Sequence, residues 1–381
     1  MMYTALDFFA GSGLVRLGLA PEFETLWAND ICAKKRAVYV ANHVHDRFHL
    51  GDIQDVQGWD LPATDLAWAS FPCQDLSLAG NLSGMNAGTR SGLFWEWVRV
   101  LQELNKHGKR PPILVAENVV GFVVANQGKH FKLAYRALRD LGYRVGAVVI
   151  DAKDFLPQSR PRAFIIAASE EIPLEGLSQE FPSGRFHTAG LVRTSFAVND
   201  PEWVWWSLPI PQGNKPTFGD LCERDAPCDP PSKTRDICAM LSPLNRKKLN
   251  AARRAKTFFA GTAYKRTRPD EEGNKIQRLE VRFDGIAGCL RTPNGGSSRQ
   301  TVILVDQGSV RSRLMTLREC ARLMGAPDTY KLNGSYNDGY RAMGDAVVVP
   351  VTRWLTRYLL TELAARSEST RTLNSASRNA A

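Results

Sequence analysis

The sequence predicts an α/β protein with a mixed β-sheet and a second, smaller and irregular domain. Short apolar runs alternate with helical patterns through roughly the first 170 residues, which is typical of a Rossmann-like domain with a mostly parallel sheet. Pro and Gly then become frequent, and regular patterns return after residue 305. With 44% hydrophobic and 23% charged residues, the 381-residue chain has the composition of an ordinary globular protein.

Six apolar runs are the expected strands of the first domain. They span residues 3–9, 24–28, 65–71, 113–116, 144–150 and 163–168. The last two are separated by about a dozen residues, too few for a helical crossover, so they predict an antiparallel hairpin at one edge of the sheet. Helices are expected at residues 92–104, 130–141, 316–324 and 347–363.

Four parts of the chain are expected from these patterns. Residues 1–172 form the first domain, 173–305 the second, and 306–365 a C-terminal segment whose helix returns to the first domain. Residues 366–381, rich in Ser, Arg, Asn and Ala, are expected to be a disordered tail. No apolar run reaches the ~18 residues that a membrane span needs, and the N-terminus lacks the basic segment of a signal peptide.

Cysteine and histidine usage favours a reducing compartment and no metal. The seven cysteines are odd in number and scattered, so they do not form a disulfide framework. His43 and His45 are two residues apart, but nothing nearby would complete a metal site, and both are expected at the surface. A cytoplasmic protein without a bound metal is therefore expected.

The positive charge is concentrated in one segment. The net charge is +10, and residues 233–315 carry 18 Lys and Arg against 7 Asp and Glu, while the rest of the chain has 31 against 32. The basic runs include Arg246, Lys247, Lys248, Arg253, Arg254, Lys265, Arg266 and Arg268. Such a concentration is the usual footprint of a polyanionic partner, although a surface tuned for solubility has the same composition.

A glycine turn after the first strand predicts a ligand site. Residues 7–13 read Asp-Phe-Phe-Ala-Gly-Ser-Gly, and glycines at such a turn let a ligand approach the backbone. Arg16 stands where the third glycine of the dinucleotide pattern would fall, so NAD is disfavoured. Asp30 follows the second of the six apolar runs, and Asp52 follows a further short apolar run that ends before Gly51. Each acid alone could be a turn residue, but together they indicate a ligand that carries a nucleoside.

A second group of side chains meets at the same edge of the predicted sheet. Cys73 follows one strand, Glu117 ends the next, and Arg160 and Arg162 lie in the hairpin turn. A lone cysteine is usually a small buried hydrophobe, and paired arginines can be surface ion pairs, but their convergence favours chemistry. Cytosine fits this group, because a thiolate can add at C6, a glutamate can hold N3 and the amine, and an arginine can hold O2. The addition makes C5 nucleophilic toward a sulfonium methyl donor.

These motifs resemble those of bacterial-type DNA cytosine-5 methyltransferases over most of the chain outside roughly 175–285. The resemblance implies a methyltransferase domain at 1–172 and a target recognition domain at 173–305. It makes Cys73 the nucleophile, places Glu117 against the cytosine ring, and matches Arg160 and Arg162 to a Gln-x-Arg-x-Arg motif. A target cytosine would leave the duplex, and after methyl transfer to C5 the C5 proton and the thiol would be lost.

The resemblance also implies S-adenosylmethionine as the cofactor and S-adenosylhomocysteine as its product. The cofactor residues that it implies are Phe9, Gly11, Gly13, Asp30, Ile31, Asp52, Ile53, Pro72, Asp345 and Ala346. One departure is that Asp345 stands where the family commonly has Asn. Glu319 and Arg322 resemble the motif that organises the recognition domain, but could equally form a surface pair one helical turn apart.

Double-stranded DNA is the expected partner, because the recognition region overlaps the basic segment. The expected DNA contacts are Gln74, Ser77, Arg246, Lys247, Arg253, Arg254, Lys265, Arg266, Arg268, Ser298 and Arg299. The loop at 295–300 could instead be a plain surface turn. A monomer is expected in the cytoplasm of a bacterium or phage host, associated with the nucleoid. The sequence leaves open whether a cognate restriction endonuclease accompanies it or whether it acts alone.

Two alternatives remain open at this point. An RNA (tRNA) cytosine-5 methyltransferase of the same fold would use the same chemistry, but the large basic recognition region disfavours it. A catalytically silent DNA-binding relative would keep the fold, and intact Cys73 and Glu117 argue against it. Enzymes that methylate exocyclic amines of DNA are disfavoured, since residues 71–74 read Phe-Pro-Cys-Gln in place of an Asp/Asn-Pro-Pro-aromatic motif.

Overall fold

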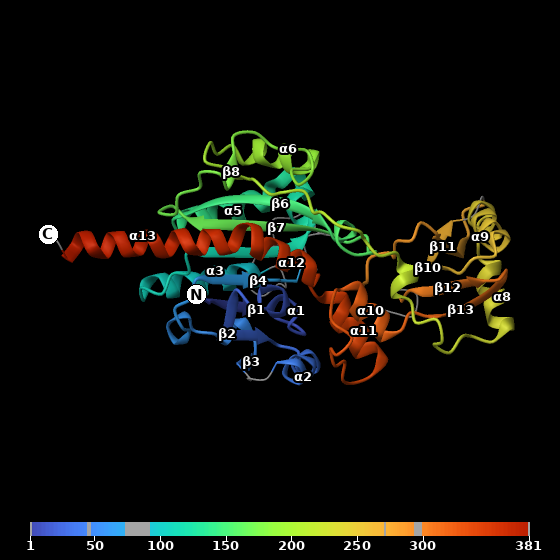
Figure 1. Cartoon of the computed structure of the whole chain (residues 1–381). Helices are drawn as coiled ribbons and strands as arrows, with labels where there is room; N and C mark the ends of the chain where they lie inside the picture. The colour runs from blue at the N-terminus through green and yellow to red at the C-terminus, as the bar shows by residue number, and fades with distance from the viewer. Residues whose placement is uncertain (1, 44–46, 73–91, 270–271, 293–298, 380–381) are drawn as a thin grey trace. The chain divides into compact units, whose positions relative to one another are not determined.

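A computed structural model describes residues 2–43, 47–72, 92–269, 272–292 and 299–379 (Figure 1). The chain divides into two compact units. Unit 1 comprises residues 1–150, 161–210 and 351–381, and unit 2 comprises residues 151–160 and 211–350. Cys73, Gln74, Ser77 and Ser298 lie outside the described residues. The functional domain boundaries expected from the sequence stay a prediction.

Unit 1 is built on a seven-stranded sheet in the order β3-β2-β1-β4-β5-β7-β6. The strands are β1 (Tyr3–Phe8), β2 (Phe23–Asp30), β3 (Phe48–Leu50), β4 (Leu66–Ala69), β5 (Ile113–Val119), β6 (Tyr143–Asp151) and β7 (Pro161–Ser169). The first five pair in parallel, and β7 is antiparallel to β5. The predicted mixed sheet with an antiparallel edge is confirmed.

The strands of this sheet read as continuous apolar runs because helices and loops bury both of its faces. All four residues of β4 are buried, as are the first six of β5. The helices of the unit are α1 (Leu14–Leu19), α2 (Ala33–Asn42), α3 (Leu93–Lys106), α4 (Val120–Val124), α5 (Lys129–Asp140) and α6 (Ala189–Val198). Trp97 of α3 and Phe131 of α5 are fully buried in the core that these elements share with the sheet. A small two-stranded sheet joins β8 (Ser178–Gln179) to β9 (Trp205–Trp206).

The C-terminal helix is longer than the sequence predicts. Residues 366–381 are expected to be a disordered tail, but α12 (Val349–Leu355) continues through a π-helical turn (Thr356–Leu360) into α13 (Thr361–Asn379). Side-chain contacts explain the difference. Arg366 pairs with Glu362 and donates to the carbonyl of Pro173, and Arg371 pairs with Asp65 at 2.8 Å. The polar composition that suggests disorder therefore includes residues that dock the helix onto unit 1.

Unit 2 contains a four-stranded antiparallel sheet in the order β11-β10-β12-β13. Its strands are β10 (Phe259–Pro269), β11 (Lys275–Arg282), β12 (Thr301–Asp306) and β13 (Ser309–Leu314). The helices are α7 (Phe218–Leu221), α8 (Pro231–Ala239), α9 (Pro243–Ala255), α10 (Leu317–Leu323) and α11 (Tyr336–Asp345). The region was expected to be irregular. The sheet escapes notice in the sequence because the consecutive polar residues 265–268 of β10 interrupt the apolar and polar alternation that indicates a strand.

The described helices include none that is both long and apolar enough to cross a membrane.

Gly146 provides a test of the packing at the edge strand β6. It bridges Val204, and a Cβ at this position would lie 2.0 Å from the Val204 carbonyl oxygen. We expect Gly146→Ala to lower the free energy of unfolding by about 1–3 kcal/mol, because backbone must move to admit the methyl group. Urea unfolding measures this. Gly184→Ala is the control, since a Cβ there meets open space. Equal stability of the two variants would contradict the packing described.

Candidate active site

The turn between β1 and α1 has a backbone that few residues other than glycine adopt. Phe9, Gly11 and Gly13 have φ values of 57°, 55° and 85°, all in the left-handed region. This left-handed backbone is unfavourable for Phe9, and backbone strain of this kind is typical of ligand-binding turns. The three residues that the sequence assigns to the cofactor therefore form one tightly shaped turn.

Asp30 holds this turn from the end of β2. Its carboxylate accepts hydrogen bonds from the backbone N–H of Gly11 at 3.1 Å and of Cys32 at 2.8 Å. Ile31, directly after it, has a side chain that is 68% exposed, which suits an apolar side chain that covers a flat ring. Asp52 follows β3 and accepts from the backbone N–H of Gln54 at 3.0 Å. The side chain of Ile53, in contrast, is buried in the core of unit 1.

His43 is buried beneath the turn between β1 and α1, although we expected it at the surface. Its Nε2 is 3.2 Å from the Gly13 carbonyl oxygen, and the imidazole is buried. Burial, with the nearby Arg16 adding to it, lowers the pKa of His43 to about 4, so the ring is neutral at pH 7. A Cβ on Gly13 would lie 2.4 Å from Nε2. His43 therefore explains why position 13 needs glycine.

Asp7, at the start of the same motif, is fully buried in β1. Neither carboxyl oxygen has a hydrogen-bond partner among the described residues. Burial raises the pKa of Asp7 well above its ordinary value, against the opposing effect of Arg16. Such an unsatisfied buried group is costly and is typical of functional sites. The sequence gives no separate signal for Asp7, because Asp7 reads there only as the first residue of the motif at 7–13.

Glu117 and Arg162 come together as predicted. They lie on the paired strands β5 and β7, and Arg162 Nε is 3.1 Å from Glu117 Oε1. Both side chains are largely buried, so the ion pair is shielded from solvent and fixes the orientation of the carboxylate. In this ladder Val119 pairs with Arg162 and Glu117 pairs with Phe164. The Cα atoms of Glu117 and Arg162 therefore lie at the same end of the two strands.

Asn118 fixes the chain just before the predicted nucleophile. Its Nδ2 donates to the Phe71 carbonyl oxygen at 3.0 Å, and its Oδ1 accepts from the backbone N–H of Val119 at 2.8 Å. Pro72 follows Phe71, and Cys73 comes next but lies outside the described residues. The segment that leads to Cys73 is thus anchored one residue away from Glu117 along β5.

Arg160 has contacts that the sequence did not suggest. Its guanidinium is 2% exposed and donates to the carbonyl oxygens of Leu290, Gly344 and Ala346 at 2.8–2.9 Å. Gln158 acts beside it, because its side chain donates to the Leu323 carbonyl and accepts from the backbone N–H of Leu290. These contacts show Arg160 binding backbone in unit 2, and its expected catalytic role stays a prediction.

Residues 344–346 are held against the segment that precedes residue 293. The Asp345 carboxylate accepts a hydrogen bond from the Thr292 hydroxyl, and a Cβ on Gly344 would lie 3.0 Å from the backbone of Arg291. Ala346 contributes its carbonyl to Arg160. Asp345, which stands where the family commonly has Asn, therefore has a hydroxyl donor as its partner within unit 2.

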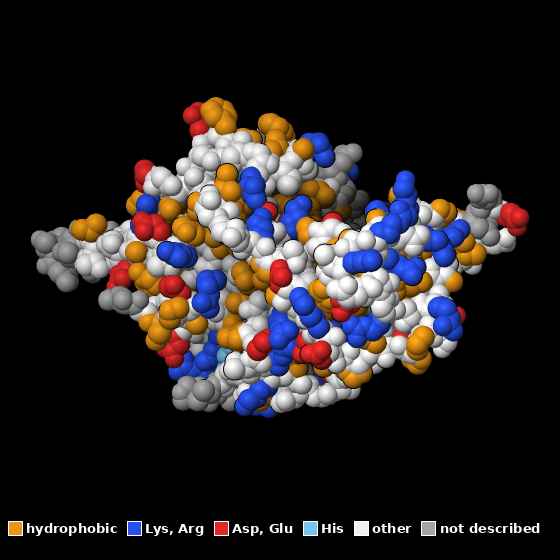
Figure 2. Space-filling model, turned by 45° about the vertical axis from the view of Figure 1, so that its right-hand side comes forward, with side chains coloured by type: hydrophobic (Ala, Val, Ile, Leu, Met, Phe, Trp, Pro, Cys, Tyr) orange, Lys and Arg blue, Asp and Glu red, His pale blue; other side chains and the backbone are white. Residues whose placement is uncertain are grey.

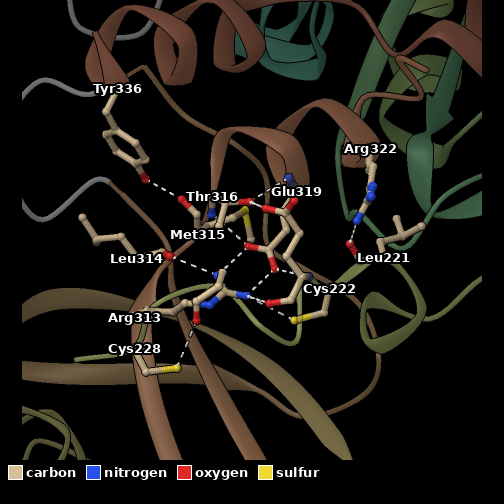
Figure 3. Close-up of polar contacts among 12 residues, drawn as sticks. Leu221, Cys222, Cys228, Arg313, Leu314, Met315, Thr316, Glu319, Arg322 and Tyr336 are labelled. Atoms are coloured by element: carbon tan, nitrogen blue, oxygen red, sulfur yellow. Dashed lines mark hydrogen bonds and ion pairs between the residues drawn. The ribbon is translucent and has the colours of Figure 1, made fainter. Parts of the chain in front are cut away.

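A buried ion pair organises the centre of unit 2 (Figure 3). Arg313 and Glu319 form two parallel bonds of 2.6 and 2.7 Å, and Glu319 also accepts from the backbone N–H of Thr316. Both side chains are almost fully buried. The alternative of a surface pair between Glu319 and Arg322 is wrong, because Arg322 pairs with Asp328 at 2.7 Å and donates to the Leu221 carbonyl.

The basic side chains assigned to DNA lie on unit 2. Arg246, Lys247, Arg253 and Arg254 are exposed on α9, while Lys265, Arg266 and Arg268 belong to β10. On the face seen in Figure 2, Lys and Arg side chains gather toward the right-hand side. The Arg299 guanidinium lies 5.9 Å from the centre of the Tyr336 ring. Among the described residues, no group of three or more His, Cys, Asp or Glu side chains could hold a metal ion.

Comparison with known proteins decides the family. The model of the family described as C-5 cytosine-specific DNA methylase matches residues 3–360. The chain belongs to this family. Members generally use S-adenosylmethionine, and the family implies a DNA substrate.

Similar proteins include bacterial enzymes of known type. The type II methyltransferase M.Bsp6I of Bacillus sp. (strain RFL6) is 27% identical, over 92% of this chain and 96% of its own. The type II methyltransferase M.NlaX of Neisseria lactamica is 26% identical, over 96% and 99%. Among solved structures, the methyltransferase EhMeth of Entamoeba histolytica has a TM-score of 0.60 at 14% identity, over 95% of this chain and 99% of its own. A putative DNA modification methyltransferase from an E. coli prophage has a TM-score of 0.53 at 18% identity, over 96% and 99%.

The buried ion pair gives a prediction for stability. Glu319→Gln leaves the Arg313 guanidinium buried without its counter-ion, so we expect a loss of about 3–5 kcal/mol in the free energy of unfolding. Asp328→Asn is the control, because it removes an exposed pair and should cost less than about 1 kcal/mol. Denaturant unfolding at pH 7 measures both. A cost for Glu319→Gln no larger than that of the control would contradict the assigned role.

The same pair predicts a pH dependence. Burial opposes the charge of Glu319, but hydrogen bonds from Arg313 outweigh it and lower the pKa of Glu319 below its ordinary value of 4.5. The stabilisation is therefore complete above pH 4.5 and is lost as the pH falls through the lowered value. The stability difference between the wild type and Glu319→Gln should shrink in that acidic range.

The contact between Gly13 and His43 gives a prediction for cofactor binding. A methyl group at position 13 would displace either the turn or the imidazole, so we expect Gly13→Ala to weaken S-adenosylmethionine binding by at least about tenfold. Titration calorimetry measures the affinity. Gly108→Ala is the matched control, because Gly108 has the same sign of φ, at 68°, and no atom near a Cβ. Equal affinities in the two variants would show that the turn does not shape the cofactor site.

Proposed function

We propose that this chain methylates C5 of a cytosine in double-stranded DNA, with Cys73 as the nucleophile. The observation that carries the proposal is the buried pair of Glu117 and Arg162, 3.1 Å apart, beside the anchored segment that leads to Cys73. A carboxylate held by a guanidinium at the ends of two strands suits a heterocycle that offers a ring nitrogen, an exocyclic amine and a carbonyl oxygen.

Each of these residues has a definite task in the proposed reaction. The Cys73 thiolate forms a bond to C6 of the cytosine, which moves electron density onto C5, the position that becomes methylated. Glu117 holds N3 and the exocyclic amine, and Arg162 both orients Glu117 and faces O2. Loss of the C5 proton to a base then expels the thiolate and restores the aromatic ring.

The residues of the glycine turn fit S-adenosylmethionine. The left-handed backbone at Gly11 and Gly13 carries no side chain to obstruct a ligand, Asp30 offers a carboxylate to ribose hydroxyls, and exposed Ile31 offers an apolar cover for adenine. Buried Asp7 supplies a further unpaired acid in the strand that leads into this turn. The cofactor, when bound, supplies the methyl group. S-adenosylhomocysteine would remain as the product.

Duplex DNA is the proposed substrate, since unit 2 carries the positive excess of the chain. The target base must leave the stack to reach Cys73, at a cost of a few kcal/mol that contacts to the DNA must offset. A cognate restriction endonuclease, suggested by relatives called type II methyltransferases, and a monomeric state complete the proposal.

Replacing the nucleophile tests the mechanism. Cys73→Ala should abolish tritium transfer from labelled S-adenosylmethionine to duplex DNA, because no addition at C6 can occur, while cofactor affinity stays at the wild-type value. DNA that contains 5-fluorocytosine should trap the wild type covalently, since fluorine cannot leave as a proton does.

Cys238→Ala, a change at a half-buried cysteine of α8, is the control and should keep full activity and adduct formation. Methyl transfer by Cys73→Ala, or no adduct with the wild type, would refute attack by the thiol. Transfer to tRNA in preference to duplex DNA would refute the substrate.

A further inference from the structure

The basic side chains of unit 2 lie on two opposite faces of its four-stranded sheet. In the β10–β11 ladder, Ala263 pairs with Val281, and both belong to the apolar cluster formed with α8 and α9. Because side chains alternate along a strand, Lys265 points to this helix-covered face. Tyr264 and Arg266 point the other way.

The opposite face of β10 and β11 is rich in arginine. Arg266 lies directly across from Arg278, and Arg282 lies across from Thr262, all on the face that also carries Tyr264. We call Arg266, Arg278 and Arg282 the arginine face. Like charges directly opposite each other are unfavourable in a sheet, so this arrangement costs stability in the absence of an anion.

Acidic neighbours compensate only part of this charge. Arg282 pairs with Asp284 at 2.6 Å, and Arg266 lies 3.5 Å from Glu280. Within the described part of the chain, no acidic side chain forms an ion pair with Arg278. The arginine face therefore keeps a positive excess that an anionic partner would relieve.

Tyr264 holds two guanidiniums at this face. The Arg266 and Arg291 guanidiniums lie 5.5 and 5.7 Å from the centre of its ring. The Tyr264 hydroxyl donates to the Cys289 carbonyl, and a Cβ on Gly288 would lie 2.6 Å from the ring. Stacking on an aromatic ring orients a guanidinium and leaves its N–H edge available for a bidentate contact.

The arginine face adjoins the segment that the hairpin turn holds. Leu290, between Cys289 and Arg291, is bound through its carbonyl by Arg160 and through its N–H by Gln158. The turn continues directly into β7, which carries Arg162. In contrast, α9 covers the opposite face of the sheet, so one straight duplex cannot lie along both the arginine face and the exposed cations of α9.

We propose that the arginine face, together with Arg291, is the surface of unit 2 that holds the target DNA, and that α9 does not contact it. This inference rests on the proposed function and names the surface that serves it. Arg266, Arg278 and Arg291 would donate paired hydrogen bonds to acceptors of DNA, either phosphate oxygens or the O6 and N7 edge of guanine.

Two double variants with the same change of charge test the proposal. Arg266→Ala with Arg278→Ala alters the arginine face, and Arg235→Ala with Lys248→Ala alters exposed cations of α8 and α9 on the other side. The probe is a duplex that contains the site found by bisulfite sequencing of DNA from cells that express the wild type. Fluorescence anisotropy gives Kd over a salt series, and melting temperature checks folding. Should the first double variant fail to fold, Arg278→Gln and Arg291→Gln replace it as single changes.

We expect the arginine-face variant to bind at least about tenfold more weakly, and the helix variant less than about threefold. The opposite order, or equal effects, would overturn the proposal. A phosphate contact should weaken binding to all sequences and reduce the salt dependence, whereas a guanine contact should relax the preference at one position. If the wild type itself fails to methylate duplex DNA, the proposed function is wrong. If the wild type is active and both double variants bind as it does, the assignment of the surface alone is wrong.

Discussion

The guanidinium of Arg160 is the group on which the arrangement of the site segments in unit 2 depends most. It is buried and bonds to three backbone carbonyls that lie 130, 184 and 186 positions away in the sequence. A buried cation is tolerated only when its N–H groups are satisfied, and the planar fork of arginine can satisfy several acceptors at once, which the single point charge of lysine cannot. One side chain thereby fixes both the segment at 290 and the turn at 344–346.

The chain path connects this interaction with the strands of unit 1. Residues 151–160 connect two strands of the unit 1 sheet, yet they pack as part of unit 2. Pro157 and Ser159 exchange backbone hydrogen bonds with Ala287, so the turn is extended by a short ladder. The backbone of residues 151–160 thus runs without interruption from the segments that Arg160 binds to β7, which carries Arg162, the partner of Glu117.

The sequence predicted the parts of the fold whose pattern is local. Buried parallel strands produce apolar runs, so β1 was found nearly to the residue and β5 was found with the correct first residue, and the acids and arginines at their ends followed from topology. The sequence placed Glu117 and Arg162 at one edge of the sheet for this reason, but it did not predict their ion pair. The sheet of unit 2 was not expected, since the run of polar residues at 265–268 hides the alternation of β10. Partners that are distant in sequence, such as Gly344 for Arg160 or Gly13 for His43, leave no local signal at all.

The packing of residues 151–160 within unit 2 also limits how the four-stranded sheet of that unit could be replaced. A new sheet could replace β10–β13 in evolution or in a chimera, but the replacement would need carbonyls in register for Arg160 and a backbone for Gln158 and Pro157 to pair with. The segment at 287–290 and the turn at 344–346 are therefore the parts of unit 2 that a replacement of the sheet would have to retain. Hybrids cut outside these two segments would keep these contacts, and hybrids cut through them would lose them.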